Sequence, residues 1–286
     1  MKKKIIRITS KIALAIIIAG LAVALPATRL NVRSSASAQN ANKSLNAPSG
    51  LQGEDAIRSL KEQGLYDSLQ EAVTATRYEL RLEDAPARGA LPPAYHGPNP
   101  AQQYDAYFTP NGFNLTPRKA AATDAAAAAA SGETDRPAEA PEWRATMRLI
   151  GYGYGEGLVT VGDAALEAQG NRIEYRRAGL PLTEWYVNKA AGIEQGFTIE
   201  TPPGIRSKGE RLRLALELTG DLSAELAEGG QAVDLKRADG TMALSYSHLY
   251  AYDAQRRELP SHMRVIEGRV ILEIDEEKAV YPVTID

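Results

Sequence analysis

Cysteine is absent from this 286-residue sequence, and histidine is rare, with only His96, His248 and His262. The lack of cysteine excludes disulfides, thiolate zinc sites, iron–sulfur clusters and a cysteine nucleophile. The three histidines are too far apart in the sequence for the short spacing of a local metal motif. We therefore expect a protein without a metal or an organic cofactor.

A surplus of positive charge is also missing. The chain has 33 Lys and Arg against 36 Asp and Glu, for a net charge of −3. Proteins that bind nucleic acid usually carry a basic face or stripe, so we expect no nucleic-acid partner. The apolar run at residues 12–27 is shorter than the roughly 20 residues of a comfortable membrane span.

The N-terminal region nevertheless has the three parts of a secretory signal. Basic residues come first: Lys2, Lys3, Lys4, Arg7 and Lys11. The apolar run at residues 12–27 follows, and then the small residues Ala36 and Ala38. This order predicts a signal peptide over residues 1–38, cleaved between Ala38 and Gln39. The alternative is an uncleaved N-terminal anchor, which would be the chain's only contact with a membrane. Both interpretations predict an exported protein, secreted or on the cell surface.

Composition divides the rest of the chain into four parts. Residues 39–53 are rich in Asn, Ser and Gly and are predicted to be a flexible leader. Residues 54–118 are predicted to contain a helical segment, interrupted at Gly64, and then the first strands. Residues 119–142 are rich in alanine and proline but have no apolar stripe, which predicts a disordered insertion.

Short alternating segments dominate residues 143–286. The clearest is RLRLALELTG, in which Leu212, Leu214 and Leu216 alternate with Arg213 and other residues. About ten such segments, separated by Gly, Pro, Asn and Asp turns, are typical of an antiparallel β-sandwich. The predicted fold class is therefore mainly β, an antiparallel β-sandwich with a short N-terminal helical segment.

Two motifs that suggest chemistry lack the residues to perform it. GYGYGEG (residues 151–157) has the glycines of a phosphate loop, but no Gly-Lys-Ser/Thr and no strong helix follow. It better suits a strand in which tyrosines alternate with glycines. DEEK (residues 275–278) lacks the remaining ligands of a calcium loop. No G-x-S-x-G elbow occurs either. We therefore predict no catalytic residues and no enzymatic activity.

The stretch LTEWYVNKAAGIEQGFTIETPP (residues 182–203) allows two interpretations. In the first, Trp185, Tyr186 and Glu194 line an exposed groove that binds or cleaves carbohydrate. In the second, which we favour, residues 184–188 and 197–200 are two strands of a hairpin with a turn after Asn188. The hairpin would put Trp185 and Val187 on one face and Tyr186 on the other.

Several phrases of the chain resemble the N-terminal region of large exported bacterial proteins. They are NPAQQYDAYFTPNGFNL, GNRIEYRR, LTEWYVNKAAGIEQGFTIETPP, RLRLALELTGDLSAEL, ADGTMALSYSHLYAYDAQRRELPSHM and YPVTID. In those proteins a passage similar to the last phrase precedes tandem FG-GAP (integrin-alpha-like) or related β-propeller repeats. The resemblance covers roughly residues 66–286 and implies a surface or secreted protein, but it brings no catalytic residue.

This sequence departs from the family in one respect, because no internal repeat follows YPVTID. We expect a fragment of a longer protein; the alternative is an N-terminal module that exists alone. The predicted function is a non-enzymatic structural or interaction module that precedes a propeller, which would be its partner. Pro282 predicts that residues 281–286 pair on one side only, or on both sides with Pro282 turned outward.

Overall fold

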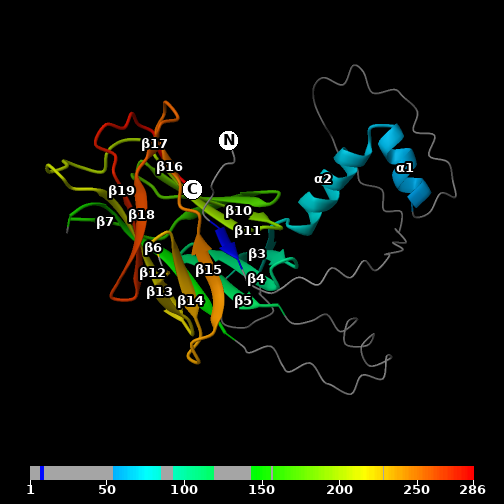
Figure 1. The fold of residues 1–286 in the computed structure, drawn as a ribbon, viewed down its shortest axis with the longest axis horizontal. Helices are drawn as coiled ribbons and strands as arrows, with labels where there is room; N and C mark the ends of the chain where they lie inside the picture. Colours follow the sequence, from blue (N-terminus) through cyan, green and yellow to red (C-terminus); the bar gives the residue numbers. More distant parts are fainter. Residues whose placement is uncertain (1–6, 10–53, 85–92, 119–142, 156, 228) are drawn as a thin grey trace. The chain divides into compact units, whose positions relative to one another are not determined.

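A computed structural model describes residues 7–9, 54–84, 93–118, 143–155, 157–227 and 229–286. The predicted leader, the predicted insertion and the Ala38–Gln39 cleavage site lie outside the described residues. The chain divides into two compact units, one formed by residues 13–73 and the other by residues 1–12 and 74–286. The described part of the smaller unit is helical, and the larger unit consists mainly of strands (Figure 1).

Two short helices lie on either side of Gly64, as the sequence predicts. They are α1 (Glu54–Glu62) and α2 (Tyr66–Arg77). Gly64 has a φ of 68° and donates its N–H to the carbonyl of Lys61, while Leu65 donates to Leu60. A left-handed residue with these two bonds is a common helix C-terminus, and glycine adopts it without a Cβ clash.

Two antiparallel sheets form the larger unit. The order of the main path of the first sheet is β13 (Ser223–Leu226), β14 (Ala232–Lys236), β15 (Met242–Ser247), β1 (Arg7–Thr9), β11 (Gly192–Ile199), β10 (Leu182–Lys189), β9 (Arg172–Arg176) and β8 (Ala165–Gln169). Three further strands complete this sheet: β16 (Ala251–Tyr252), β17 (Glu258–Leu259) and β20 (Val283–Ile285).

The second sheet contains the remaining strands. Their order is β18 (Ser261–Ile266), β19 (Arg269–Ile274), β12 (Leu212–Gly220), β6 (Ala145–Tyr154), β5 (Gly112–Pro117), β4 (Tyr104–Thr109), β3 (Ala94–Asn99) and β2 (Arg81–Glu83), with β7 (Val159–Thr160) paired to β6. The predicted mainly-β class with antiparallel sheets is confirmed. Pro110 and Asn111 form the turn that connects β4 to β5, and Gly112 is the first residue of β5.

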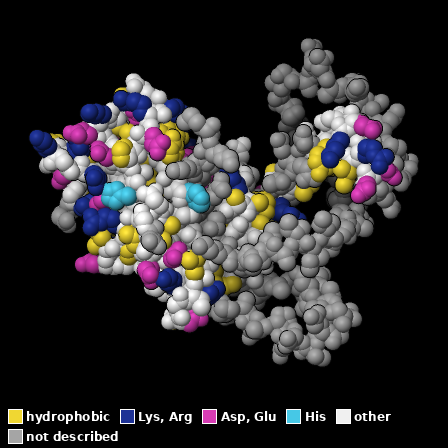
Figure 2. Space-filling model, viewed as in Figure 1, with side chains coloured by type: hydrophobic (Ala, Val, Ile, Leu, Met, Phe, Trp, Pro, Cys, Tyr) yellow, Lys and Arg dark blue, Asp and Glu magenta, His cyan; other side chains and the backbone are white. Residues whose placement is uncertain are grey.

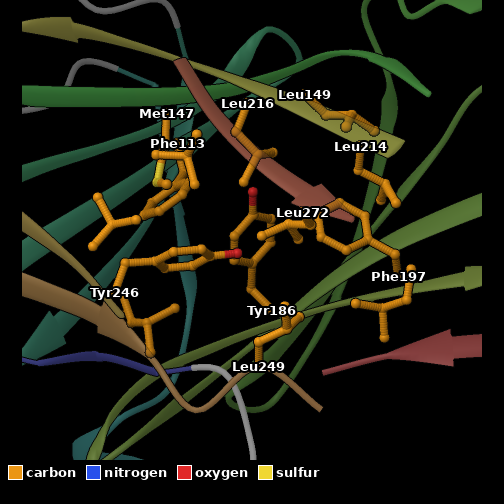
Figure 3. Packing of buried hydrophobic residues seen from close by; sticks show 14 of the residues in the cluster. Phe113, Met147, Leu149, Tyr186, Phe197, Leu214, Leu216, Tyr246, Leu249 and Leu272 are labelled. Atoms are coloured by element: carbon orange, nitrogen blue, oxygen red, sulfur yellow. The ribbon is translucent and has the colours of Figure 1, made fainter. Parts of the chain in front are cut away.

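One apolar core lies between the sheets. Phe113 and Leu214 come from the second sheet, and Tyr186, Phe197 and Tyr246 come from the first (Figure 3). All five side chains are fully buried. The rings of Phe113 and Tyr186 are 4.8 Å apart between centroids, so aromatic contacts connect the two layers. Burying one side chain of this size stabilises the folded protein by roughly 1.5–3 kcal/mol relative to leaving it exposed.

Residues 151–154 of the glycine-tyrosine motif belong to β6, and no helix follows them among the described residues. Tyr152 and Tyr154 are buried on the inner face, while Gly151 and Gly153 alternate with them. A Cβ at Gly151 would approach the side chain of Leu158 to 3.2 Å, so the segment leading into β7 packs closely on this glycine. The motif is therefore a strand with room on one face for a neighbouring chain segment, not a phosphate loop.

Two strands, β1 and β20, lie near the two ends of the sequence. β20 pairs with β11 on one side and β16 on the other, and Pro282 is exposed just before it. This is the second of the two arrangements expected for residues 281–286. β1 lies inside the predicted signal peptide, for which no strand is predicted.

Candidate functional site

Trp185 lies on the outer face of the first sheet, opposite Gly196. A Cβ at Gly196 would collide with the indole ring, so the ring lies directly on the glycine backbone. The guanidinium of Arg172 lies 4.6 Å from the ring centroid on the other side. With 8% of its surface exposed, Trp185 is covered rather than presented as a platform for a sugar.

Tyr186 and Glu194 do not join Trp185 in a groove. Tyr186 points into the core from the opposite face of β10, as the hairpin interpretation predicts. Glu194 lies on the outer face, where it is buried and forms an ion pair with Lys189. The common exposed groove of the carbohydrate hypothesis is therefore not formed by these three residues.

The most polar part of the core surrounds Glu184. Its carboxylate accepts hydrogen bonds from Arg177 Nη2 at 2.8 Å, Tyr186 Oη at 2.5 Å and Gln195 Nε2 at 2.9 Å. The hydroxyl of Tyr246 donates to Gln195 Oε1 at 3.1 Å and is directed toward Tyr186 (Figure 3). Burial raises the pKa of Tyr186 well above its usual value, and the charge of Glu184 adds to this effect.

This buried network is closed to a substrate. The side chains of Arg177 and Glu184 are 4% and 2% exposed. A general acid or nucleophile must come within hydrogen-bond distance of the reacting group, and a carboxylate that is 2% exposed is not presented to one. The network therefore fixes the packing of β10 against its neighbours. No local sequence pattern indicates the role of Arg177, because it meets Glu184 only in the folded sheet.

A second group of charged residues gathers on the outer face of the second sheet. Glu273 in β19 lies opposite His262 in β18 and Arg213 in β12. Its carboxylate accepts from Arg213 Nε at 2.9 Å and lies 2.7 Å from His262 Nε2. Arg264 and Arg211 also approach it, with N–O distances of 3.7 and 3.9 Å. We call Arg211, Arg213 and Arg264 the arginine cluster.

A hollow of about 330 Å³ lies beside the arginine cluster and is also lined by Gly155, Gly209 and Glu210. A neighbouring hollow of about 410 Å³ shares Arg213 and Gly155 with it. Its lining includes Gly151, Ala215 and Leu158, which packs on Gly151. Figure 2 shows basic side chains and a histidine together over β18 and β19.

The charge of the first hollow favours an anion. Three guanidinium groups line it together with two carboxylates, Glu273 and Glu210. Glu273 is only 2% exposed, whereas Arg211 and Arg264 are about half exposed. The long distances from Glu273 leave both arginines with N–H donors that the carboxylate does not occupy. Planar guanidinium groups suit the oxygens of a carboxylate or a phosphate.

Other kinds of site receive no support in the described ranges. No group of three or more His, Asp or Glu side chains there is arranged to hold a metal ion. Of the helices described, neither has the length and apolar character to cross a membrane. Comparisons of the sequence with protein-family models, curated proteins and solved structures find no match.

Proposed function

We propose that this chain is a non-enzymatic interaction module of an exported bacterial protein, and that it binds an anionic group at the arginine cluster. The observation that carries the proposal is the sharing of one buried carboxylate, Glu273, among three guanidinium groups beside an open hollow. The ligand is a carboxylate or phosphate group of the partner.

The environment of the buried acids supports a role without catalysis. Glu184, Glu194 and Glu273 each form a close ion pair with a basic side chain, and each side chain is at most 7% exposed. Each carboxylate is thus engaged by a basic side chain instead of being presented as a free base or nucleophile. Turnover by the purified chain in a broad glycosidase, esterase and protease screen would contradict this part of the proposal.

The composition of residues 1–38 supports export, and the phrases that resemble exported repeat proteins support a position before a repeat region. The basic start, the apolar run and Ala36 and Ala38 are the features that a signal peptidase substrate needs. The repeat region is then the expected partner within the full-length protein. Mass spectrometry of the exported protein tests the leader, with an N-terminus at Gln39 as the expected result.

Phosphate-dependent stability tests the anion site. A ligand that binds only the folded state stabilises that state, and the stabilisation grows with the logarithm of the ligand concentration once this exceeds the Kd. We expect the melting temperature of the parent chain to rise with sodium phosphate at constant ionic strength, but not with sodium chloride. The double variant Arg211→Gln/Arg264→Gln is expected to lose most of this rise. Both residues are half exposed, so the variant keeps the Arg213–Glu273 pair.

Arg81→Gln is the matched control, because Arg81 is an exposed arginine with a carboxylate partner, Glu79, on another part of the sheet. It should respond to phosphate like the parent chain. An equal phosphate effect in the double variant and in the control would show that the arginine cluster is not the site.

A further inference from the structure

The first sheet contains one strand that comes from far away in the sequence. β1 lies between β11 and β15 and pairs antiparallel with both. Ile8 is the Cα partner of Ile193 on one side and of Tyr246 on the other. Arg7 is the partner of Glu194, and Thr9 of Ser245. A three-residue segment of the predicted signal peptide thus completes the sheet.

Without β1, the sheet would be open at this point. β11 has β10 on its other edge, and β20 pairs with it only at Phe197–Ile199, beyond the region that β1 occupies. β15 has β14 on its other edge. The facing edges of β11 and β15 would therefore lose the strand between them, and on β11 the Ile193 N–H would keep its bond to the Tyr104 hydroxyl. We call this gap, between Ile193–Glu194 and Ser245–Ser247, the strand slot. Unpaired edges of this kind are templates for an added strand.

The residues beside the strand slot determine which peptide fits it. Residues directly opposite one another in an antiparallel pair share a face of the sheet. The central position lies between Ile193 and Tyr246, which are both fully buried in the core, so it requires an apolar residue. The preceding position is opposite Glu194, which favours a basic or polar residue. Because the slot has a strand on each side, the peptide can form backbone hydrogen bonds with both.

We propose that the strand slot is an acceptor site for an extended segment of another polypeptide. The leader fills the slot in the precursor, and a partner strand fills it after the leader has been removed. This inference rests on the proposed export, because cleavage after Ala38 is the step that removes β1. A second copy of the mature chain is not the expected donor, since cleavage removes β1 from every copy.

The full chain with Ile8→Pro tests the slot without depending on export. Proline has no N–H to donate and is not tolerated in the middle of a sheet, so it should displace β1 while leaving β11 and β15 unchanged. The probe is a fluorescent peptide of residues 4–11, KIIRITSK, and the control peptide carries proline in place of the residue corresponding to Ile8.

We expect the Ile8→Pro chain to bind the probe at least about tenfold more tightly than the parent chain, a difference of roughly 1.4 kcal/mol, with the control peptide not binding. Amide exchange within residues 245–247 of β15 should slow when the probe is added. Equal binding to both chains, no binding to either, or no change in exchange would overturn the proposal. Dimerisation of the Ile8→Pro chain without peptide would also overturn it, because a different segment of a second copy would then fill the slot.

The exported protein provides the second part of the test. If its N-terminus is Gln39, it should bind the probe without the proline substitution. Failure of this mature form to bind overturns the acceptor site even if export is correct. An exported form that retains Arg7–Thr9 overturns the exchange of strands, whatever the peptide does with the Ile8→Pro chain. The two failures are therefore distinguishable.

Discussion

Replacing Glu184 with glutamine should destabilise the protein strongly. The substitution keeps the size of the side chain but leaves the positive charge of Arg177 without its partner in a site where that side chain is 4% exposed. Breaking a buried ion pair in this way costs roughly 3–5 kcal/mol, which is a large part of the roughly 5–15 kcal/mol of a typical domain. The hydrogen bonds from Tyr186 and Gln195 can persist, because both reach Oε1, the position that the carbonyl oxygen of the new amide can occupy.

Glu217→Gln is the matched control, because it makes the same chemical change in a partly exposed pair. Glu217 accepts from Arg148 at 2.7 Å, and the two side chains are 31% and 38% exposed. Surface pairs of this kind contribute about 0–1 kcal/mol. A second comparison is the double variant Arg177→Met/Glu184→Gln. It removes both charges and should recover much of the loss, since the cost of Glu184→Gln arises mainly from the unpaired Arg177.

Urea unfolding followed by tryptophan fluorescence measures these differences. Trp143 and Trp185 are both buried, so their emission should shift when the chain unfolds. The free energy of unfolding is obtained by linear extrapolation to zero urea. The account of the buried network would be refuted by a loss for Glu184→Gln within about 1 kcal/mol of the control. A double variant less stable than Glu184→Gln alone would also refute it.

Two further predictions concern other parts of the sheets. Burial alone would lower the pKa of His96, but hydrogen bonds and charges from Asp105 and Glu83 outweigh it and raise the pKa above 6.5. The contribution of charged His96 to stability is therefore fully present below about pH 6.5 and is lost as the pH rises through the folded-state pKa of His96. The free energy of unfolding should fall over that pH range, and it should fall less in His96→Gln. Gly196→Ala should cost roughly 1–3 kcal/mol by forcing Trp185 off the backbone, and unchanged tryptophan emission in the folded variant would contradict this.

Local sequence patterns were sufficient to predict much of the fold. The alternating leucines around Leu214 predict β12, Gly64 predicts the break between α1 and α2, and the exposed Pro282 agrees with a strand that begins after it. Each of these signals depends on neighbours in the chain, through side-chain alternation or turn geometry. The order of strands in the sheets depends on distant pairings and could not be predicted in the same way.

The candidate sites depend on these distant pairings. Arg213, Arg264 and Glu273 lie on three strands, and only the registers of β12, β18 and β19 bring them together. The sequence patterns do not predict β1, because residues 7–9 belong to a segment that also matches the basic start of a signal peptide. The carbohydrate hypothesis placed Tyr186 in a groove, but the alternation of β10 directs this side chain into the core.

An NMR titration of the arginine side chains with inorganic phosphate tests the proposed function most directly. Signals from the Nε–Hε groups of Arg211, Arg213 and Arg264 should shift together and saturate with one Kd, while the signal of Arg81 should not follow them. The spectrum also locates the anion, which a change in melting temperature does not. Shifts that grow linearly without saturation, or that are equal at Arg81, would contradict an anion site at the arginine cluster.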